Sequence, residues 1–172
     1  MGMDVIGRNP KNKTGEYFRA NIWSWRPINF LCWYSSLSHH METGEKSLIP
    51  DKTMDGMSHN QGDGLRSDRK CKLLAEWLEY YIEKLFDPKV VPFEIESPQK
   101  DGVKFGVYGD GNFYIDVGYY VGIPNESGSR PFLSEEEGKD PNIEKWSAHT
   151  TNKDHIQGFI DFLRNCGGFQ VF

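Results

Sequence analysis

The hydrophobic positions of this chain follow two different periods, which predict a mixture of helices and strands. The clearest helix is expected from Ser67 to Phe86, because apolar residues recur there every three or four positions: Cys71, Leu74, Leu78, Tyr81, Ile82 and Leu85. Ser67 is a typical N-cap, Asp68 favours the first turn through the helix dipole, and Asp87-Pro88 ends the pattern.

Two further helices are expected nearer the ends of the chain. One begins at Pro27, since proline is tolerated at the first helical position, and its apolar face holds Phe30, Trp33 and Tyr34. The other runs from Thr151 to Asn165, with a capping-box pattern in Thr151 and Asp154. Gly167-Gly168 ends it, and its apolar face consists of Ile156, Phe159, Ile160 and Leu163.

Alternating hydrophobic positions predict strands over residues 3–7 and 169–172, and a β-hairpin in the middle of the chain. Its strands, 103–108 and 112–122, flank the tight-turn sequence Gly109-Asp110-Gly111. In the second strand one side is expected to carry Phe113, Ile115, Val117, Tyr119 and Val121, and the other Tyr114, Asp116 and Tyr120.

The segments between these elements predict the domain organisation. Residues 38–64 and 123–148 have no clear period and are expected to be long loops. No repeat or linker divides the chain, so residues 1–172 are expected to form a single domain. We therefore predict an α+β fold with a small mixed sheet, made of the N-terminal strand, the central hairpin and the C-terminal strand, packed against two or three helices.

Composition narrows the functional classes. Aromatic residues make up 14% of the chain and hydrophobic residues only 37%, which predicts a core rich in Trp, Phe and Tyr. A net charge of −5 argues against general binding to nucleic acid. No segment is apolar over the roughly 18 residues of a membrane span, and the start lacks the pattern of a signal peptide. Three cysteines without a CxxC pair indicate buried thiols in a reducing cytoplasm.

A dense block of aromatic and basic residues, 15–27, is the main candidate for a ligand site. Tyr17, Trp23 and Trp25 could stack on a planar ligand. Arg19 and Arg26 could bind a phosphate or a carboxylate. The alternative is that the tryptophans fill the core and the arginines stack on them or pair with acids.

The loop 60–65 before the predicted central helix is a second candidate, because glycines allow a ligand to approach the backbone. Asn60 and Asp63 would contribute from this loop, although it matches neither a P-loop nor a calcium loop. The alternative is a turn in which Asp63 caps the chain or pairs with Arg19 or Arg26.

Other chemistry is weakly indicated. His39, His40 and His59 lie in an acidic region, and the sequence leaves open whether they bind a metal, although adjacent histidines rarely face one ion. No nucleophile motif is present, so we assign no catalytic residue, metal site or cofactor.

Three segments resemble a family of uncharacterised phage and bacterial proteins. The start matches the pattern MGxDVxG followed by GEYFRxNxWxWRP, residues 60–65 match NxGDGL, and residues 159–169 match FxxFLxxCGGF. Many members carry a zinc-binding CxxCxGxG insertion where this chain has its predicted hairpin, so the resemblance implies no zinc here. It implies a phage or bacterial cytoplasmic setting and no particular activity.

Three functional hypotheses follow. The leading one is a small, phage-encoded cytoplasmic accessory protein that binds a small anionic or planar ligand, or a host protein. The second is a hydrolase or transferase for nucleotides, with Asp63 and His59 as acid–base candidates. The third is a self-assembling module in which Tyr114 and Tyr120 form the contact of a homo-oligomer.

Overall fold

The computed structural model describes residues 2–90, 92–97 and 102–172, and it confirms the predicted α+β class. The helices of this part are α1 (Ile22–Thr43), α2 (Asp51–Ser58), α3 (Asp68–Leu85), α4 (Glu135–Lys139) and α5 (Lys153–Asn165), with a 3-10 turn at Lys13–Gly15. The strands are β1 (Gly2–Gly7), β2 (Tyr17–Asn21), β3 (Phe93–Glu96), β4 (Lys104–Val107), β5 (Phe113–Asp116), β6 (Tyr120–Val121), β7 (Trp146–Ser147), β8 (Thr150–Thr151) and β9 (Phe169–Val171).

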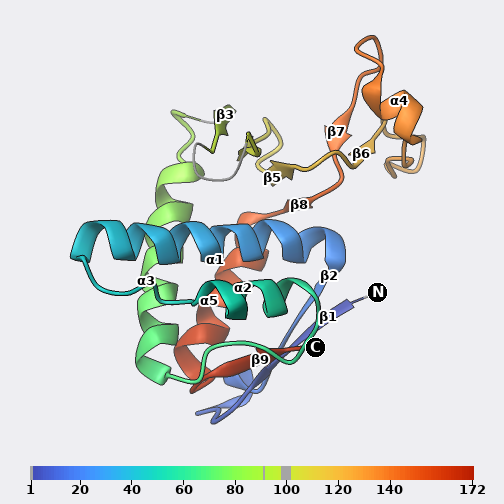
Figure 1. Cartoon of the computed structure of the whole chain (residues 1–172). Coiled ribbons are helices and arrows are strands. Elements are labelled where there is room, and N and C mark those ends of the chain that lie inside the picture. The colour runs from blue at the N-terminus through green and yellow to red at the C-terminus, as the bar shows by residue number, and fades with distance from the viewer. Residues whose placement is uncertain (1, 91, 98–101) are drawn as a thin grey trace.

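Helices occupy the middle of the molecule and strands lie at its two ends. Figure 1 shows α1 crossing in front of α3 and α5, with β1, β2 and β9 at one end and β3, β5 and β8 at the other. The strand pair β6–β7 and the short helix α4 project from the second end (Figure 1). The predicted helix from Ser67 to Phe86 is confirmed as α3, and the side chain of Ser67 accepts the Lys70 N–H as expected.

The predicted sheet is divided in two. The N-terminal and C-terminal strands share one sheet, in the order β2-β1-β9 with Val5 opposite Val171. The central hairpin is confirmed, but it belongs to a separate sheet of order β3-β4-β5-β8. All pairings among the described strands are antiparallel, so neither sheet is mixed. The helices lie between these two sheets (Figure 1).

The predicted alternation of the second hairpin strand ends early. Strand β5 stops at Asp116, and Gly118 then adopts a positive φ of 85°, which turns the chain. As a result Tyr119, expected on the same side as Phe113 and Ile115, is 53% exposed, whereas those two residues are buried. Tyr114, expected on the outer side, is buried; its ring stacks on Tyr108 with centroids 4.0 Å apart.

Helix α1 begins five residues before the predicted start. Asn21 is its N-cap, because its side chain accepts the N–H of Ser24 at 2.8 Å, and Pro27 lies inside the helix. Helix α1 also continues to Thr43, and α2 follows at Asp51, so the prediction of one long loop over residues 38–64 was wrong.

The last helix is confirmed as α5, with a different cap. Asn152 rather than Thr151 accepts the N–H of His155, at 2.8 Å, because Thr151 is held in strand β8. The segment 123–148 is largely irregular, as expected, apart from α4 and β7.

The core is aromatic, as the composition predicted. Its largest fully buried side chains include Trp25, Phe105, Phe113, Phe159, Phe162 and Phe169. The rings of Trp25 and Phe159 meet edge to face at 5.6 Å and join α1 to α5. The three cysteines are free and buried, which confirms the prediction for the thiols. Within the described residues, no helix is long and apolar enough to cross a membrane.

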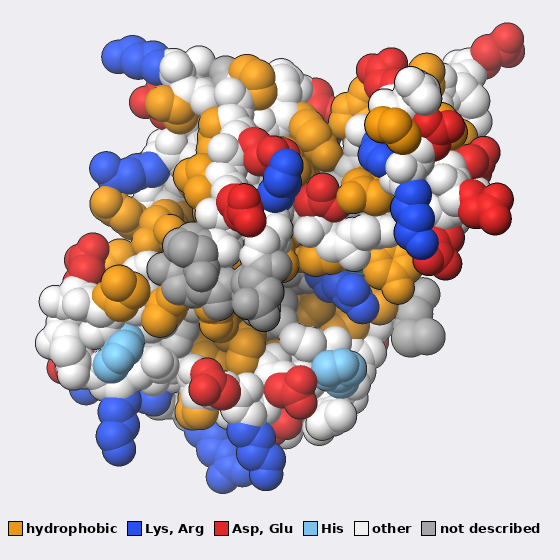
Figure 2. Space-filling view, turned by 45° about the horizontal axis from the view of Figure 1, so that its top comes forward, with side chains coloured by type: hydrophobic (Ala, Val, Ile, Leu, Met, Phe, Trp, Pro, Cys, Tyr) orange, Lys and Arg blue, Asp and Glu red, His pale blue; other side chains and the backbone are white. Residues whose placement is uncertain are grey.

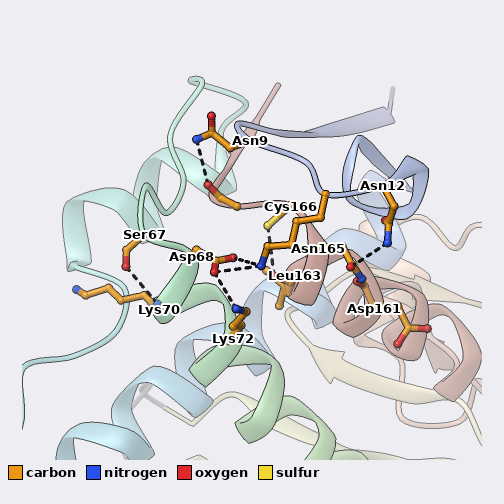
Figure 3. A network of polar contacts seen from close by, with 12 residues as sticks. Asn9, Asn12, Ser67, Asp68, Lys70, Lys72, Asp161, Leu163, Asn165 and Cys166 are labelled. Atoms are coloured by element: carbon orange, nitrogen blue, oxygen red, sulfur yellow. Dashed lines mark hydrogen bonds and ion pairs between the residues drawn. The ribbon is translucent and has the colours of Figure 1, made fainter.

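A polar network ties the start of α3 to the first loop of the chain. Asp68 lies 2.9 Å from the amino group of Lys11 and 2.9 Å from that of Lys72. Figure 3 shows Asp68 and Lys72 within this network. The hydrogen bond from Lys72, and after it the one from Lys11, lowers the pKa of Asp68; the Lys72 bond has the larger effect. Nearby, Asn12 bonds to Asn165 at the end of α5 (Figure 3). The first loop is therefore held against both helices.

Candidate ligand-binding sites

The structure distributes the aromatic and basic block over three different environments. Strand β2 carries Tyr17 and Arg19 on an exposed edge, and α1 carries Trp23, Trp25 and Arg26. Trp25 is only 1% exposed and its indole N–H donates to the backbone oxygen of Met57 at 3.0 Å. It is therefore a core residue, and the prediction that it stacks on a ligand was wrong.

Arg19 and Tyr17 share a carboxylate partner. The hydroxyl of Tyr17 donates to Asp4, which raises the pKa of Tyr17. The Nε of Arg19 lies 3.8 Å from the same carboxylate, and the Arg19 side chain is 68% exposed. A long, exposed ion pair of this kind contributes little, so the guanidinium keeps donors available for another anion.

A polar cleft lies beside Arg19. Its volume is about 660 Å³, and besides Arg19 its walls include Asn21, Ser24, Thr150, Asn152 and His155. We call it the Arg19 cleft. Among the described residues that line it there is no carboxylate, and Arg19 is the one Lys or Arg. The described lining of the cleft therefore carries the positive charge of Arg19 and no negative charge.

Two helices begin at the Arg19 cleft. The caps of α1 and α5, Asn21 and Asn152, both line it. The first N–H groups of a helix have no partner within the helix, and the helix dipole adds positive potential there. His155 on the first turn of α5 bridges the walls, since its ring bonds to Thr151 at 3.2 Å and to the backbone oxygen of Arg19 at 3.1 Å. These contacts hold β2 against α5.

A second hollow lies farther along α1, and we call it the Arg26 pocket. Its volume is about 460 Å³. Polar groups on its wall come from Arg26, Asn29, Ser58 and His59, and the apolar wall consists of Phe30, Val103, Ile115 and Val117. In Figure 2, hydrophobic side chains reach the surface between the strands and the helices on this side of the molecule.

Trp23 is enclosed by other rings. Its centroid lies 4.9 Å from that of His149 and 4.9 Å from that of Phe132, and Tyr119 meets it at 6.0 Å. These contacts occupy the ring, so it takes part in an aromatic cluster and lines neither the Arg19 cleft nor the Arg26 pocket.

The aromatic cluster contains a buried histidine. His149 is 1% exposed, and neither ring nitrogen has a hydrogen-bond partner among the described residues. Burial, and then the nearby cation of Arg26, lower the pKa of His149 to about 4. The backbone carbonyl of Trp23 lacks its usual helical partner, because Pro27 has no N–H. This carbonyl acts to raise the pKa of His149, but it makes no well-formed hydrogen bond with the ring. His149 is therefore neutral at pH 7.

Asn60 and Asp63 line neither the Arg19 cleft nor the Arg26 pocket. The loop that carries them continues the C-terminal sheet, since Gly62 donates to the Val171 oxygen and Val171 donates to the Asp63 oxygen. The Asp63 carboxylate packs on Gly56, where an added Cβ would meet it at 1.9 Å. Among the described residues Asp63 forms no ion pair with an arginine, so the expected pairing with Arg19 or Arg26 was wrong.

The histidines of the acidic region have separate partners. His39 is buried, with its ring 3.2 Å from Glu45 and 3.4 Å from the indole nitrogen of Trp77. His40 bonds to the backbone of Glu45, and His59 to that of Asp55. Across the described part of the chain, no three His, Cys, Asp or Glu side chains are grouped as metal ligands.

The sequence pointed to Arg19 and Arg26, but not to most of the residues that line the two hollows with them. Asn152, Thr150 and His155 reach the Arg19 cleft only through the fold. Asn29 could have been found, because it lies three residues after Arg26 and so shares its helix face.

Comparison of the chain with protein-family models, curated proteins and solved structures found no match. The resemblance to the phage and bacterial family stays a prediction.

Proposed function

We propose that this protein binds a small anionic ligand in the Arg19 cleft. The observation that carries the proposal is the convergence of the Arg19 guanidinium with the beginnings of α1 and α5, in a cleft whose described lining has no carboxylate. A guanidinium offers paired donors for phosphate or carboxylate, and helix N-termini favour the same charge. The resemblance of the sequence supports an accessory role in a phage or its host, in which the protein sequesters such an anion.

The two other hypotheses have less support. Asp63 and His59, the acid–base candidates of an enzyme, make no hydrogen bond or ion pair with one another among the described residues. The self-assembly hypothesis required Tyr114 to be exposed, but Tyr114 is 5% exposed and its hydroxyl donates to Glu94 at 2.5 Å. Tyr114 therefore belongs to the fold of its own chain, and that part of the hypothesis was wrong.

Titration calorimetry with inorganic phosphate tests the proposal. Arg19→Gln should weaken phosphate binding about tenfold or more, since a charge-assisted hydrogen bond contributes about 1.5–3 kcal/mol. Arg66→Gln is the matched control, because Arg66 is an exposed arginine that does not line the cleft. The melting temperature of both variants should equal that of the wild type, since both side chains are exposed.

Equal phosphate affinity in the wild type and Arg19→Gln would refute the proposal. Native mass spectrometry of protein taken from cells complements the titration, because a retained anion would appear as added mass. That added mass should be absent from Arg19→Gln and present in Arg66→Gln.

A further inference from the structure

We propose that the Arg26 pocket is a second binding site, which takes a planar heterocycle bearing an N–H donor and an anionic substituent, as a nucleoside monophosphate with an exocyclic amine does. The inference is independent of the Arg19 cleft, since the two hollows share no lining residue among those described. Its volume of about 460 Å³ falls in the usual range of small-molecule sites.

The side chain of Asn29 supplies an acceptor that the protein does not use. Asn29 is 9% exposed and lines the pocket, and its Oδ1 has no hydrogen-bond partner among the described residues. Its Nδ2 donates to the Ser58 hydroxyl at 2.7 Å. A buried amide oxygen without a donor is costly. Because Oδ1 is itself buried, a small turn of the Asn29 amide toward the pocket brings it to a donor on the ligand, and the ligand then gains more than the bond alone.

Ser58 determines which end of the Asn29 amide is left unpaired. The Ser58 hydroxyl donates its only hydrogen to the Met54 backbone oxygen, at 3.0 Å. It can therefore only accept from Asn29, which turns the amide NH₂ toward Ser58 and leaves the oxygen unpaired. The site thus favours a donor on the ligand, such as the exocyclic amine of adenine or cytosine.

Arg26 supplies the charge at the edge of the same pocket. It lies one turn before Asn29 on the same face of α1 and is exposed. No carboxylate of the described residues lies within ion-pair distance of it, and its guanidinium stands 6.0 Å from the ring of Tyr119. An exposed guanidinium without an acid partner is suited to bind the phosphate of a ligand whose ring lies deeper.

The remaining wall is apolar and suits a flat ring. Phe30 from α1 and Ile115 from β5 are core residues whose side chains reach the pocket, and Val117 continues this surface. Apolar walls with a few convergent polar groups are the usual composition of small-molecule sites. The pocket thus presents an acceptor, a cation and an apolar surface, and these match an amine, a phosphate and a ring.

Equilibrium titration of the full chain with adenosine 5′-monophosphate, its amine-free analogue and adenosine tests each match on the wild-type protein. Adenosine 5′-monophosphate should bind about 5- to 100-fold more tightly than purine riboside 5′-monophosphate, which lacks only the amine. It should also bind about tenfold more tightly than adenosine, which lacks the phosphate. No binding of adenosine or cytidine 5′-monophosphate at millimolar concentration would overturn the inference.

Two variants test which residue binds the amine of the ligand and which binds its phosphate. Asn29→Leu should lower the affinity for adenosine 5′-monophosphate to that for the amine-free analogue, while the melting temperature stays equal or rises. Arg26→Gln should lower the affinity for adenosine 5′-monophosphate to the affinity for adenosine, and should leave the affinity for adenosine unchanged. Equal affinity in the wild type and either variant would contradict the assignment.

Arg19→Gln separates this inference from the proposed function. It should weaken the binding of inorganic phosphate and remove any adenosine 5′-monophosphate bound in the Arg19 cleft, while the binding of adenosine, which has no phosphate, stays unchanged. If Arg19→Gln instead abolishes nucleotide binding and Arg26→Gln preserves it, the nucleotide lies in the Arg19 cleft and the second site is refuted. If phosphate binding fails and nucleotide binding follows Asn29 and Arg26, only the Arg19 cleft is refuted.

Discussion

Replacing His149 with phenylalanine should remove most of the loss of stability that this protein suffers between pH 7.5 and pH 5. The imidazole is 1% exposed, between the rings of Trp23 and Tyr119, and neither nitrogen is hydrogen-bonded within the described residues. A proton on this ring would place a charge in an apolar cluster close to the cation of Arg26. The folded state therefore resists protonation, whereas the unfolded chain does not.

The sign and size of the effect follow from the two pKa values. The pKa of His149 is about 4 in the folded protein, and the ordinary value of 6.5 applies to the unfolded chain. Because the unfolded state binds the proton first, the stability is complete above pH 6.5 and falls as the pH drops from 6.5 toward 4. The full difference corresponds to about 3 kcal/mol, of which about 2 kcal/mol is lost by pH 5.

Urea unfolding at pH 7.5 and pH 5.0 measures this difference. The wild type should lose about 2 kcal/mol of unfolding free energy more than His149→Phe, which keeps the ring contacts but cannot titrate. His59→Gln is the control, because it replaces a histidine at an exposed position. If His149→Phe loses as much stability as the wild type over this interval, the reasoning from burial is refuted.

Two further variants test the fold that holds the sites. Trp25→Ala should lower the unfolding free energy by about 3–5 kcal/mol, because it empties the centre of the core and removes the hydrogen bond to Met57. Thermal unfolding measures this loss, and a loss below about 1 kcal/mol would mean that Trp25 is not a core residue. Asn152→Ala should cost about 1 kcal/mol by removing the cap of α5. Asn152→Ser, which keeps a capping oxygen, is the comparison, and an equal loss in both variants would contradict the assignment of the cap.

The elements that could be predicted are those whose signals are local and agree with each other. Helix α3 has an N-cap, an apolar stripe and a terminating proline within about twenty residues of sequence, and it forms where expected. The hairpin β4–β5 likewise depends on alternation and on a glycine turn. Helix α1 was misplaced because two start signals compete, Asn21 and Pro27, and the tertiary contacts of Trp23 and Trp25 favour the earlier one.

The sequence by itself determined the α+β class, the aromatic core and the buried thiols, and it drew attention to Arg19 and Arg26. Each of these depends on residue type or on local spacing, which folding does not change. Only the tertiary structure decided that Arg19 and Arg26 serve different hollows. The chain changes from strand to helix at Asn21, so side chains that are neighbours in sequence turn to different surroundings. Their partners, Asn152 for one and Ser58 for the other, lie far along the chain and are brought there by the packing of α5 and α2.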